Sequence, residues 1–108
     1  PSIAVAPFSN LSDNPEHDFF SYGLTEDIIR LLARNRWLKV LSRHTLAPMI
    51  SAKASVTEIG ASLGVRYIVQ GSVRRAGERV RITAELVSAA DGEQLWSESY
   101  DIELPDIF

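Results

Sequence analysis

The sequence predicts an α+β domain in which two main helices pack on a five-stranded mixed sheet, in the order β-α-β-α-β-β-β. An apolar run near the amino terminus precedes a helical pattern of apolar residues, a capping box begins a second helix, and three stretches of alternating polarity follow from residue 67 onward. The 108 residues, 45% of them hydrophobic, can bury one core. We therefore expect residues 1–108 to form one domain, excised from a longer chain.

The first two elements are a buried strand and an amphipathic helix. Residues 2–8, SIAVAPF, are a nearly unbroken apolar run closed by proline, which predicts a central strand buried on both faces. Residues 14–35 offer Asn14 as the N-cap and then repeat apolar residues at i+3 and i+4, which predicts a helix. Gly23 lies inside this pattern, so a break with a second cap at Thr25 is an alternative.

Three segments lead from this helix to the alternating stretches. Residues 37–43, WLKVLSR, predict a second strand, whereas residues 44–55 are interrupted by Pro48 and predict only a helical turn and a loop. Residues 56–63 predict a short helix, because an S-x-x-E capping box starts at Ser55 and a glycine follows the last residue.

The alternating stretches predict two hairpins. They cover residues 66–75, 78–89 and 94–103. In the first hairpin, a two-residue turn at Ala76 and Gly77 pairs Val73 with Val80 and gathers the apolar side chains on one face.

The second hairpin is predicted to close through a three-residue loop that begins at Ala90, with Gly92 in the left-handed conformation of a β-bulge. This loop length places Trp96 and Tyr100 on the core side. Glu98 then faces the same side and is expected at its rim.

The first hairpin also carries four arginines within eight positions, which raises a choice between a phosphate-binding edge and a solvated charged face. The predicted pairing puts Arg74 opposite Arg79, and the second hairpin sets Arg81 opposite Asp101 and Arg79 opposite Glu103. Nucleic-acid binding favours an unbalanced basic surface, whereas this chain has a net charge of -3. We therefore expect these arginines to lie on the solvent-exposed face of the sheet, where carboxylates of the next strand pair with them, and we expect no nucleic-acid partner. A nucleic-acid contact through the hairpin from Arg74 to Arg81 stays open as an alternative.

No pattern of catalytic or metal-binding residues emerges from the sequence. The chain has no cysteine, and its two histidines, His17 and His44, lack the spacing of metal ligands and are expected in surface or capping roles. Glu26 and Arg30 are read as an ordinary i,i+4 helix pair. We expect no catalytic residue, no metal, no cofactor and no membrane contact by this segment. The lack of cysteine is compatible with both cytoplasm and periplasm.

Two groups of residues are candidate binding sites. The loop after the first strand could hold a polar ligand at the carboxyl end of that strand, although turn chemistry before a helix explains the same residues. Its polar residues are Ser9, Asn10, Ser12 and Asp13. At the other end of the chain, Ile107 and Phe108 follow a proline, and we expect them to form a partner interface.

Three motifs, taken together, carry a family resemblance. APFSNLS at residues 6–12, GLTEDI at residues 23–28 and the hairpin pattern RYIVQGSVR with RVRITAELV and LW resemble the TolB amino-terminal-like domain of bacterial multidomain proteins. The chain departs from that pattern at Tyr22, where an acid is common, and at Ala6, where leucine is usual.

The resemblance implies an accessory domain of a signalling protein. Such domains usually accompany a class III cyclase or a winged-helix regulator domain and precede tetratricopeptide repeats. It implies no catalytic residues, and it leads us to expect a non-enzymatic interaction or sensory module, packed against helical repeats of the same chain or another protein, with self-association as a further outcome. The alternative from a different class is a small-molecule-binding regulatory domain.

Overall fold

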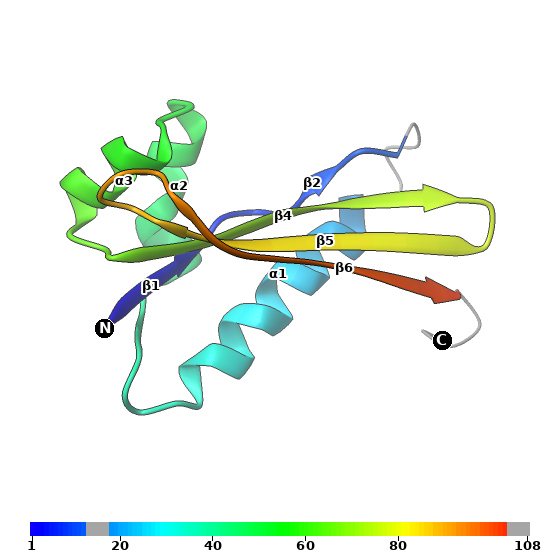
Figure 1. The fold of residues 1–108 in the computed structure, drawn as a ribbon, viewed down its shortest axis with the longest axis horizontal. Coiled ribbons are helices and arrows are strands. Elements are labelled where there is room, and N and C mark those ends of the chain that lie inside the picture. The colour runs from blue at the N-terminus through cyan, green and yellow to red at the C-terminus, as the bar shows by residue number, and fades with distance from the viewer. Residues whose placement is uncertain (13–17, 104–108) are drawn as a thin grey trace.

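The computed structural model describes residues 1–12 and 18–103, which form a six-stranded mixed sheet with helices on both faces (Figure 1). The strands follow the order β3-β1-β4-β5-β6, and β2 pairs with β4 beyond the end of β1. Their bounds are β1 Ser2–Val5, β2 Ser9–Asn10, β3 Lys39–Val40, β4 Tyr67–Ala76, β5 Arg79–Ser88 and β6 Gln94–Glu103. β1 runs parallel to β3 and β4, whereas β4, β5 and β6 form an antiparallel ribbon. The predicted α+β class is confirmed.

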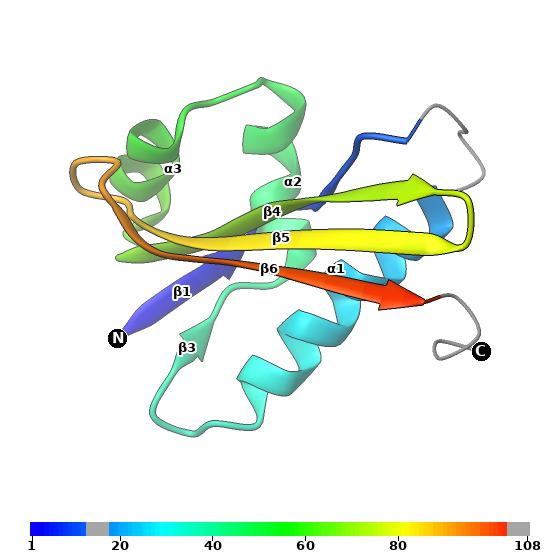
Figure 2. The same cartoon turned by 45° about the vertical axis from the view of Figure 1, so that its right-hand side comes forward.

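Three helices cover the two faces of the sheet (Figure 2). They are α1 Asp18–Ala33, α2 Arg43–Ser51 and α3 Val56–Leu63. α1 packs on one face, against a core that includes Val5 and Val73, while α2 and α3 pack on the other, against a core that includes Ala4 and Ile68. β1 therefore contributes consecutive side chains to both cores, as predicted for a central strand.

The first helix is continuous through Gly23, so the alternative break at Thr25 is wrong. A Cβ at Gly23 would meet nothing within 4 Å, which shows that no packing contact requires glycine there. The predicted N-cap Asn14 lies outside the described residues.

The segment predicted as a helical turn and a loop is a nine-residue helix, α2, and this expectation is wrong. Ser42 caps it by accepting a hydrogen bond from the Thr45 amide. Pro48 removes one intrahelical hydrogen bond, yet Pro48 is exposed and the opposite side of the helix buries Leu46 in the core. Tertiary packing therefore outweighs the local cost of the proline.

The helix α3 has the predicted bounds and caps. The Glu58 carboxylate accepts a hydrogen bond from the Ser55 amide, and the Ser55 hydroxyl accepts one from the Glu58 amide. Hydrogen bonding of the Glu58 carboxylate to Ser55, first to its backbone amide and then to its side chain, lowers the pKa of Glu58 below its ordinary value. Gly64 ends the helix with a φ of 69°, in the left-handed region that glycine adopts without strain.

The first hairpin has the predicted faces but a different register. Val73 pairs with Ile82 and Arg74 with Arg81, so the predicted pairs Val73–Val80 and Arg74–Arg79 are wrong by two residues. The two-residue turn is Gly77–Glu78, with Gly77 at a φ of 62°, as expected when glycine occupies the first central position. A shift of two residues keeps every side chain on its face, which is why polarity alone did not detect it.

The second hairpin has the predicted register over most of its length. Ile82 pairs with Tyr100 and Arg81 with Asp101, and a bulge near the loop shifts the pairing after Leu86. Gly92 has the predicted left-handed φ, although five residues, 89–93, separate the strands rather than three.

β6 lies at the edge of the sheet, and its aromatic side chains do not enter the core. The side chains of Trp96 and Tyr100 are 45% and 47% exposed, so the expectation that they are buried is wrong. Glu98 pairs with Ala84 on the predicted face and is exposed. No helix within the described residues is both long and apolar enough to cross a membrane.

Candidate functional site: a cleft between two helices

A cleft of about 410 Å³ opens where the chain leaves the carboxyl end of β1. β1 leads into α1 on one face of the sheet, and β3 leads into α2 on the other (Figure 2). The cleft lies between these two helices, which follow neighbouring parallel strands. Open α/β sheets bind ligands at this position, where successive connections leave for opposite faces. The lining residues are Val5, Pro7, Phe8, Asn10, Asp18, Ser21, Tyr22, Thr25, Glu26, Arg43, Leu46, Ala47, Ile50 and Ser51.

A buried threonine fixes the loop that forms one wall of the cleft. The Thr25 hydroxyl accepts a hydrogen bond from the Phe8 amide at 3.0 Å and donates one to the Ser21 carbonyl at 2.9 Å. Thr25 is 4% exposed, so both bonds are shielded from water. The segment after β1 and the middle of α1, which carry two of the three resemblance motifs, meet at this hydroxyl.

The Phe8 ring is seated on a glycine of β4. A Cβ built at Gly71 would lie 2.6 Å from Phe8 Cε2 and would collide with the Thr83 carbonyl oxygen. Phe8 itself is 4% exposed and packs with Val5 and Val73 in the core on the α1 side. Gly71 is therefore required by close packing, and it helps to set the position of the cleft wall.

An ion pair between α2 and α1 lies next to a tyrosine ring in the cleft. Arg43 Nε lies 3.4 Å from Glu26 Oε1, and the Arg43 guanidinium carbon lies 4.8 Å from the centre of the Tyr22 ring. The predicted pair between Glu26 and Arg30 is wrong, because Arg30 pairs with Asp27 at 3.3 Å. Glu26 instead faces inward and joins α1 to α2.

Two polar atoms on this wall lack hydrogen bonds among the described residues. They are Ser21 Oγ and Glu26 Oε1, and both are shielded from solvent. Glu26 Oε1 has the Arg43 charge nearby, but the geometry is that of an ion pair without an aligned hydrogen bond. Buried polar groups are nearly always hydrogen-bonded, so a cluster of unsatisfied ones suggests a missing partner.

The predicted polar loop is partly built into the fold. Ser9 and Asn10 form β2 beside β4, and the Ser12 hydroxyl accepts a hydrogen bond from the Arg75 amide at 2.7 Å. Asn10 lines the cleft and its side-chain amide donates to Asp18 at 2.7 Å. Asp13 lies outside the described residues. The role of this loop in ligand binding stays a prediction.

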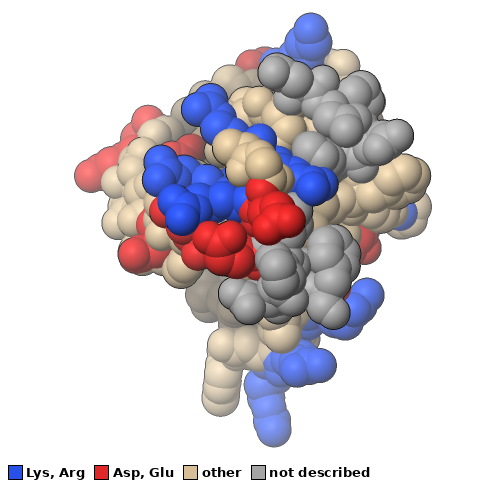
Figure 3. Space-filling view, turned by 90° about the vertical axis from the view of Figure 1, so that its right-hand side faces the viewer, with Lys and Arg blue, Asp and Glu red and all other residues tan. Residues whose placement is uncertain are grey.

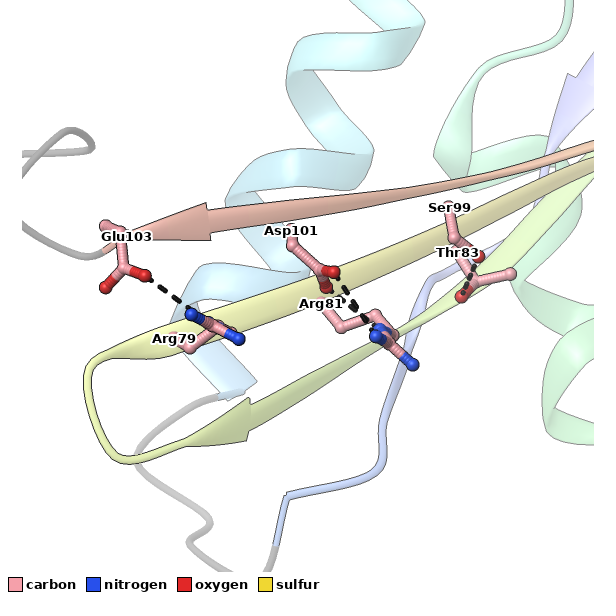
Figure 4. A network of polar contacts seen from close by, with 6 residues as sticks. All are labelled: Arg79, Arg81, Thr83, Ser99, Asp101 and Glu103. Atoms are coloured by element: carbon pink, nitrogen blue, oxygen red, sulfur yellow. Dashed lines mark hydrogen bonds and ion pairs between the residues drawn. The ribbon is translucent and has the colours of Figure 1, made fainter.

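Two of the four ribbon arginines, Arg79 and Arg81, pair with carboxylates of β6. Basic and acidic side chains lie next to one another on this face of the molecule (Figure 3). Arg81 Nε lies 2.9 Å from Asp101 Oδ1 and its second nitrogen 3.2 Å from Oδ2, while Arg79 Nε lies 3.3 Å from Glu103 (Figure 4). The hydrogen bond from Arg81 lowers the pKa of Asp101. Both predicted pairs are confirmed, and Arg81–Asp101 also relieves the repulsion between Arg81 and Arg74, which face each other.

Sequence reasoning missed the residues that make the cleft. Arg43 was assigned to the end of a strand, Ser21 to the first helix, and Thr25 to that helix or to an alternative cap within it. His44 lies exposed in α2, not in a loop, whereas His17 falls outside the described residues. Within residues 1–12 and 18–103, no group of three or more His, Cys, Asp and Glu side chains could hold a metal ion. A small signal was present, because Thr25 and Glu26 lie in GLTEDI, one of the three motifs that carry the family resemblance.

Solved structures with the same fold include three bacterial proteins. The C-terminal domain of LpoB from Salmonella enterica has a TM-score of 0.74 at 17% identity, covering 94% of this chain and 82% of that chain. Lipoprotein GNA1162 from Neisseria meningitidis has a TM-score of 0.77 at 19% identity, covering 94% and 79%. TolB from Acinetobacter baumannii has a TM-score of 0.65 at 17% identity, covering 99% and 24%. The expected TolB-like character is thus confirmed at the level of the fold.

Sequence comparisons point to regulatory and signalling proteins. A protein of Rhizobium meliloti (strain 1021) named "Putative adenylate cyclase 3" is 44% identical over 108 residues, all of this chain and 18% of that protein. The chain therefore spans less than a fifth of the length of this relative. Residues 1–106 match the family described as HilA/YgeH-like transcriptional regulator, second domain. The chain belongs to this family of second domains of HilA/YgeH-like transcriptional regulators.

Proposed function

We propose that this domain is a non-enzymatic regulatory module of a bacterial signalling protein, which docks a helical segment of the same polypeptide on β6. The observation that carries the proposal is a row of two exposed aromatic side chains on this edge strand, Trp96 and Tyr100. Trp96 and Tyr100 lie on the same face of the sheet as α1, but at its edge, and both remain about half exposed. Membership of a regulator family and likeness to a protein named for a cyclase support the link to an effector domain.

The chemistry of the row indicates the kind of segment that fits it. Glu98 lies between Trp96 and Tyr100 on the same face, because side chains of a strand alternate. Asp101 and Glu103 already pair with arginines of β5, so Glu98 is the acid of β6 that faces this surface. An amphipathic helix with an apolar stripe and one lysine or arginine would complement the row. The Rhizobium meliloti relative is long enough to contain such a segment, because most of its length lies outside the match.

Hydrogen exchange in the natural polypeptide tests the docking. We expect the β6 amides to exchange more slowly in the whole polypeptide than in residues 1–108 alone, and Trp96→Ser or Glu98→Lys to remove that protection. Trp37→Ser is the matched control, because Trp37 is 79% exposed after α1 and away from β6. Equal exchange in both forms would overturn the proposal, as would dimerisation of the isolated chain through β6.

Two further expectations belong to the same proposal. The isolated chain should not turn over ATP, and turnover that a single substitution within residues 1–108 abolishes would contradict the non-enzymatic assignment. Ile107 and Phe108, the predicted partner contacts, lie outside the described residues, so their role stays a prediction. Extending the chain by the natural segment that follows should then raise the melting temperature. An unchanged melting temperature would count against a joint at these residues.

A further inference from the structure

We propose that the cleft between α1 and α2 binds a small amphipathic carboxylate, with its apolar tail against the cleft wall and its carboxylate on Arg43. The site is independent of the docking at β6, so either proposal can fail without the other. The proposal rests on three features of the cleft. Its wall is apolar, the terminal nitrogens of Arg43 face no carboxylate among the described residues, and the acids Asp18 and Glu26 already face Asn10 and Arg43.

The cleft wall is suited to an apolar body. Phe8 comes from the loop after β1, Leu46 and Ile50 come from α2, and the Tyr22 ring comes from α1. The volume of about 410 Å³ lies within the range of small-molecule sites, which are lined mainly by apolar side chains with a few polar groups.

Arg43 supplies most of the unused hydrogen-bonding capacity of the cleft. A guanidinium carries five N–H donors, and among the described residues Arg43 directs only Nε toward a carboxylate, Glu26 at 3.4 Å. Stacking on Tyr22 at 4.8 Å restrains the plane of the guanidinium. The two terminal nitrogens are therefore held in place, and a planar carboxylate is the group that matches two parallel donors.

The acids of the cleft do not offer a competing site for a cation. The Asp18 carboxylate accepts a hydrogen bond from the Asn10 side chain at 2.7 Å, and Glu26 Oε1 is shielded from solvent beside Arg43. Ser21 lies on the same wall, and its hydroxyl, also without a hydrogen bond among the described residues, is shielded from solvent. Glu26 Oε1 already faces the Arg43 charge, so the terminal nitrogens of Arg43 are the donors left for an acceptor on the ligand.

Three probes with the same tail and different head groups separate charge recognition from apolar burial. Octanoate, 1-octanol and octylamine are titrated calorimetrically into the chain. We expect octanoate to bind about tenfold or more tightly than either of the others, because only the carboxylate can accept two hydrogen bonds from Arg43. Equal binding of all three, or tighter binding of octylamine, would overturn the proposal.

Substitutions then place the binding in the cleft. Arg43→Gln should weaken octanoate binding about tenfold or more, whereas Arg66→Gln should leave it unchanged. Arg66 is the matched control, because it also lies over a tyrosine ring, that of Tyr67, at 5.8 Å, but lines a different hollow. Ala47→Trp, a change at an exposed position of α2 that lines the cleft, should block octanoate while the circular dichroism spectrum stays that of the parent. Octanoate binding that survives both Arg43→Gln and Ala47→Trp would contradict the site.

Discussion

Two arginine–carboxylate pairs, one in the cleft and one on the ribbon, show how the same chemistry serves different ends. Arg81 makes two hydrogen bonds to Asp101, at 2.9 and 3.2 Å, in the open. Arg43 approaches Glu26 at 3.4 Å through one nitrogen, in a less exposed setting and without an aligned hydrogen bond. The ribbon pair is bidentate and joins neighbouring strands, whereas in the cleft pair only one nitrogen of Arg43 faces a carboxylate.

The comparison also shows why charge density is a poor guide to function here. Four arginines within eight positions stand out in the sequence, yet Arg79 and Arg81 are neutralised by carboxylates of the neighbouring strand β6. Arg43 stands alone in a segment that reads as a strand end. Its surroundings become visible only when α1 and α2 are brought together. Unsatisfied groups in a concave site are therefore more informative than the number of charges.

The largest expected effect tests whether the cleft wall depends on close packing. Gly71→Ala should destabilise the fold by about 3 kcal/mol, because the added methyl group collides with a backbone oxygen and with the Phe8 ring. Urea denaturation measures the loss. Gly23→Ala is the matched control, since it has open space and should gain up to about 1 kcal/mol from helix propensity. An unchanged midpoint for Gly71→Ala would contradict the tight contact.

The next effect concerns the hydroxyl that holds the cleft loop. Thr25→Val should cost about 2 kcal/mol, because the Phe8 amide would remain buried without an acceptor. Thr25→Ser keeps the oxygen and should recover most of the loss. If valine and serine prove equally destabilising in urea, the threonine contributes through its methyl group and the hydrogen bond is not what fixes the loop.

The smallest expected effect concerns the Arg81–Asp101 pair of the ribbon. The pKa of Asp101 is lowered in the fold, so its contribution is fully present above the ordinary pKa of aspartate, about 3.9, and is lost as the pH falls through the lower folded value. The difference in melting temperature between the chain and Asp101→Asn should therefore be constant near neutral pH and shrink in acid. It should also shrink at high salt. A difference that grows on acidification would contradict the assigned pair.

Local signals predicted the parts of the fold that local chemistry controls. The capping box at Ser55 and the glycine at position 64 defined α3 to the residue, because each acts within one turn of the helix. The register of the second hairpin was also predicted over most of its length, because the alternation excludes a two-residue loop and Gly92 fits the left-handed position of a longer one. The first hairpin was not, because two registers satisfy the same alternation and the choice depends on where Gly77 sits in the turn.

The remaining errors share one physical cause, which is packing between distant segments. Pro48 argued against a helix, but burial of Leu46 stabilises α2 in spite of it. Trp96 and Tyr100 have the alternation of core residues, yet the strand that carries them lies at the sheet edge. The cleft was beyond local rules altogether, because Arg43, Glu26 and Tyr22 meet only across two helices.

An NMR titration of the ¹⁵N-labelled chain with octanoate tests the contrast between the two arginine sites most directly. The side-chain Nε–H signals of Arg43 and Arg81 report the two pairs in one spectrum. We expect the Arg43 signal and the amides of Ser21, Tyr22 and Ala47 to shift with a common saturation curve, while Arg81 stays in place. Shifts confined to Arg79 and Arg81, or an Arg43 signal that does not move at saturating octanoate, would contradict the account.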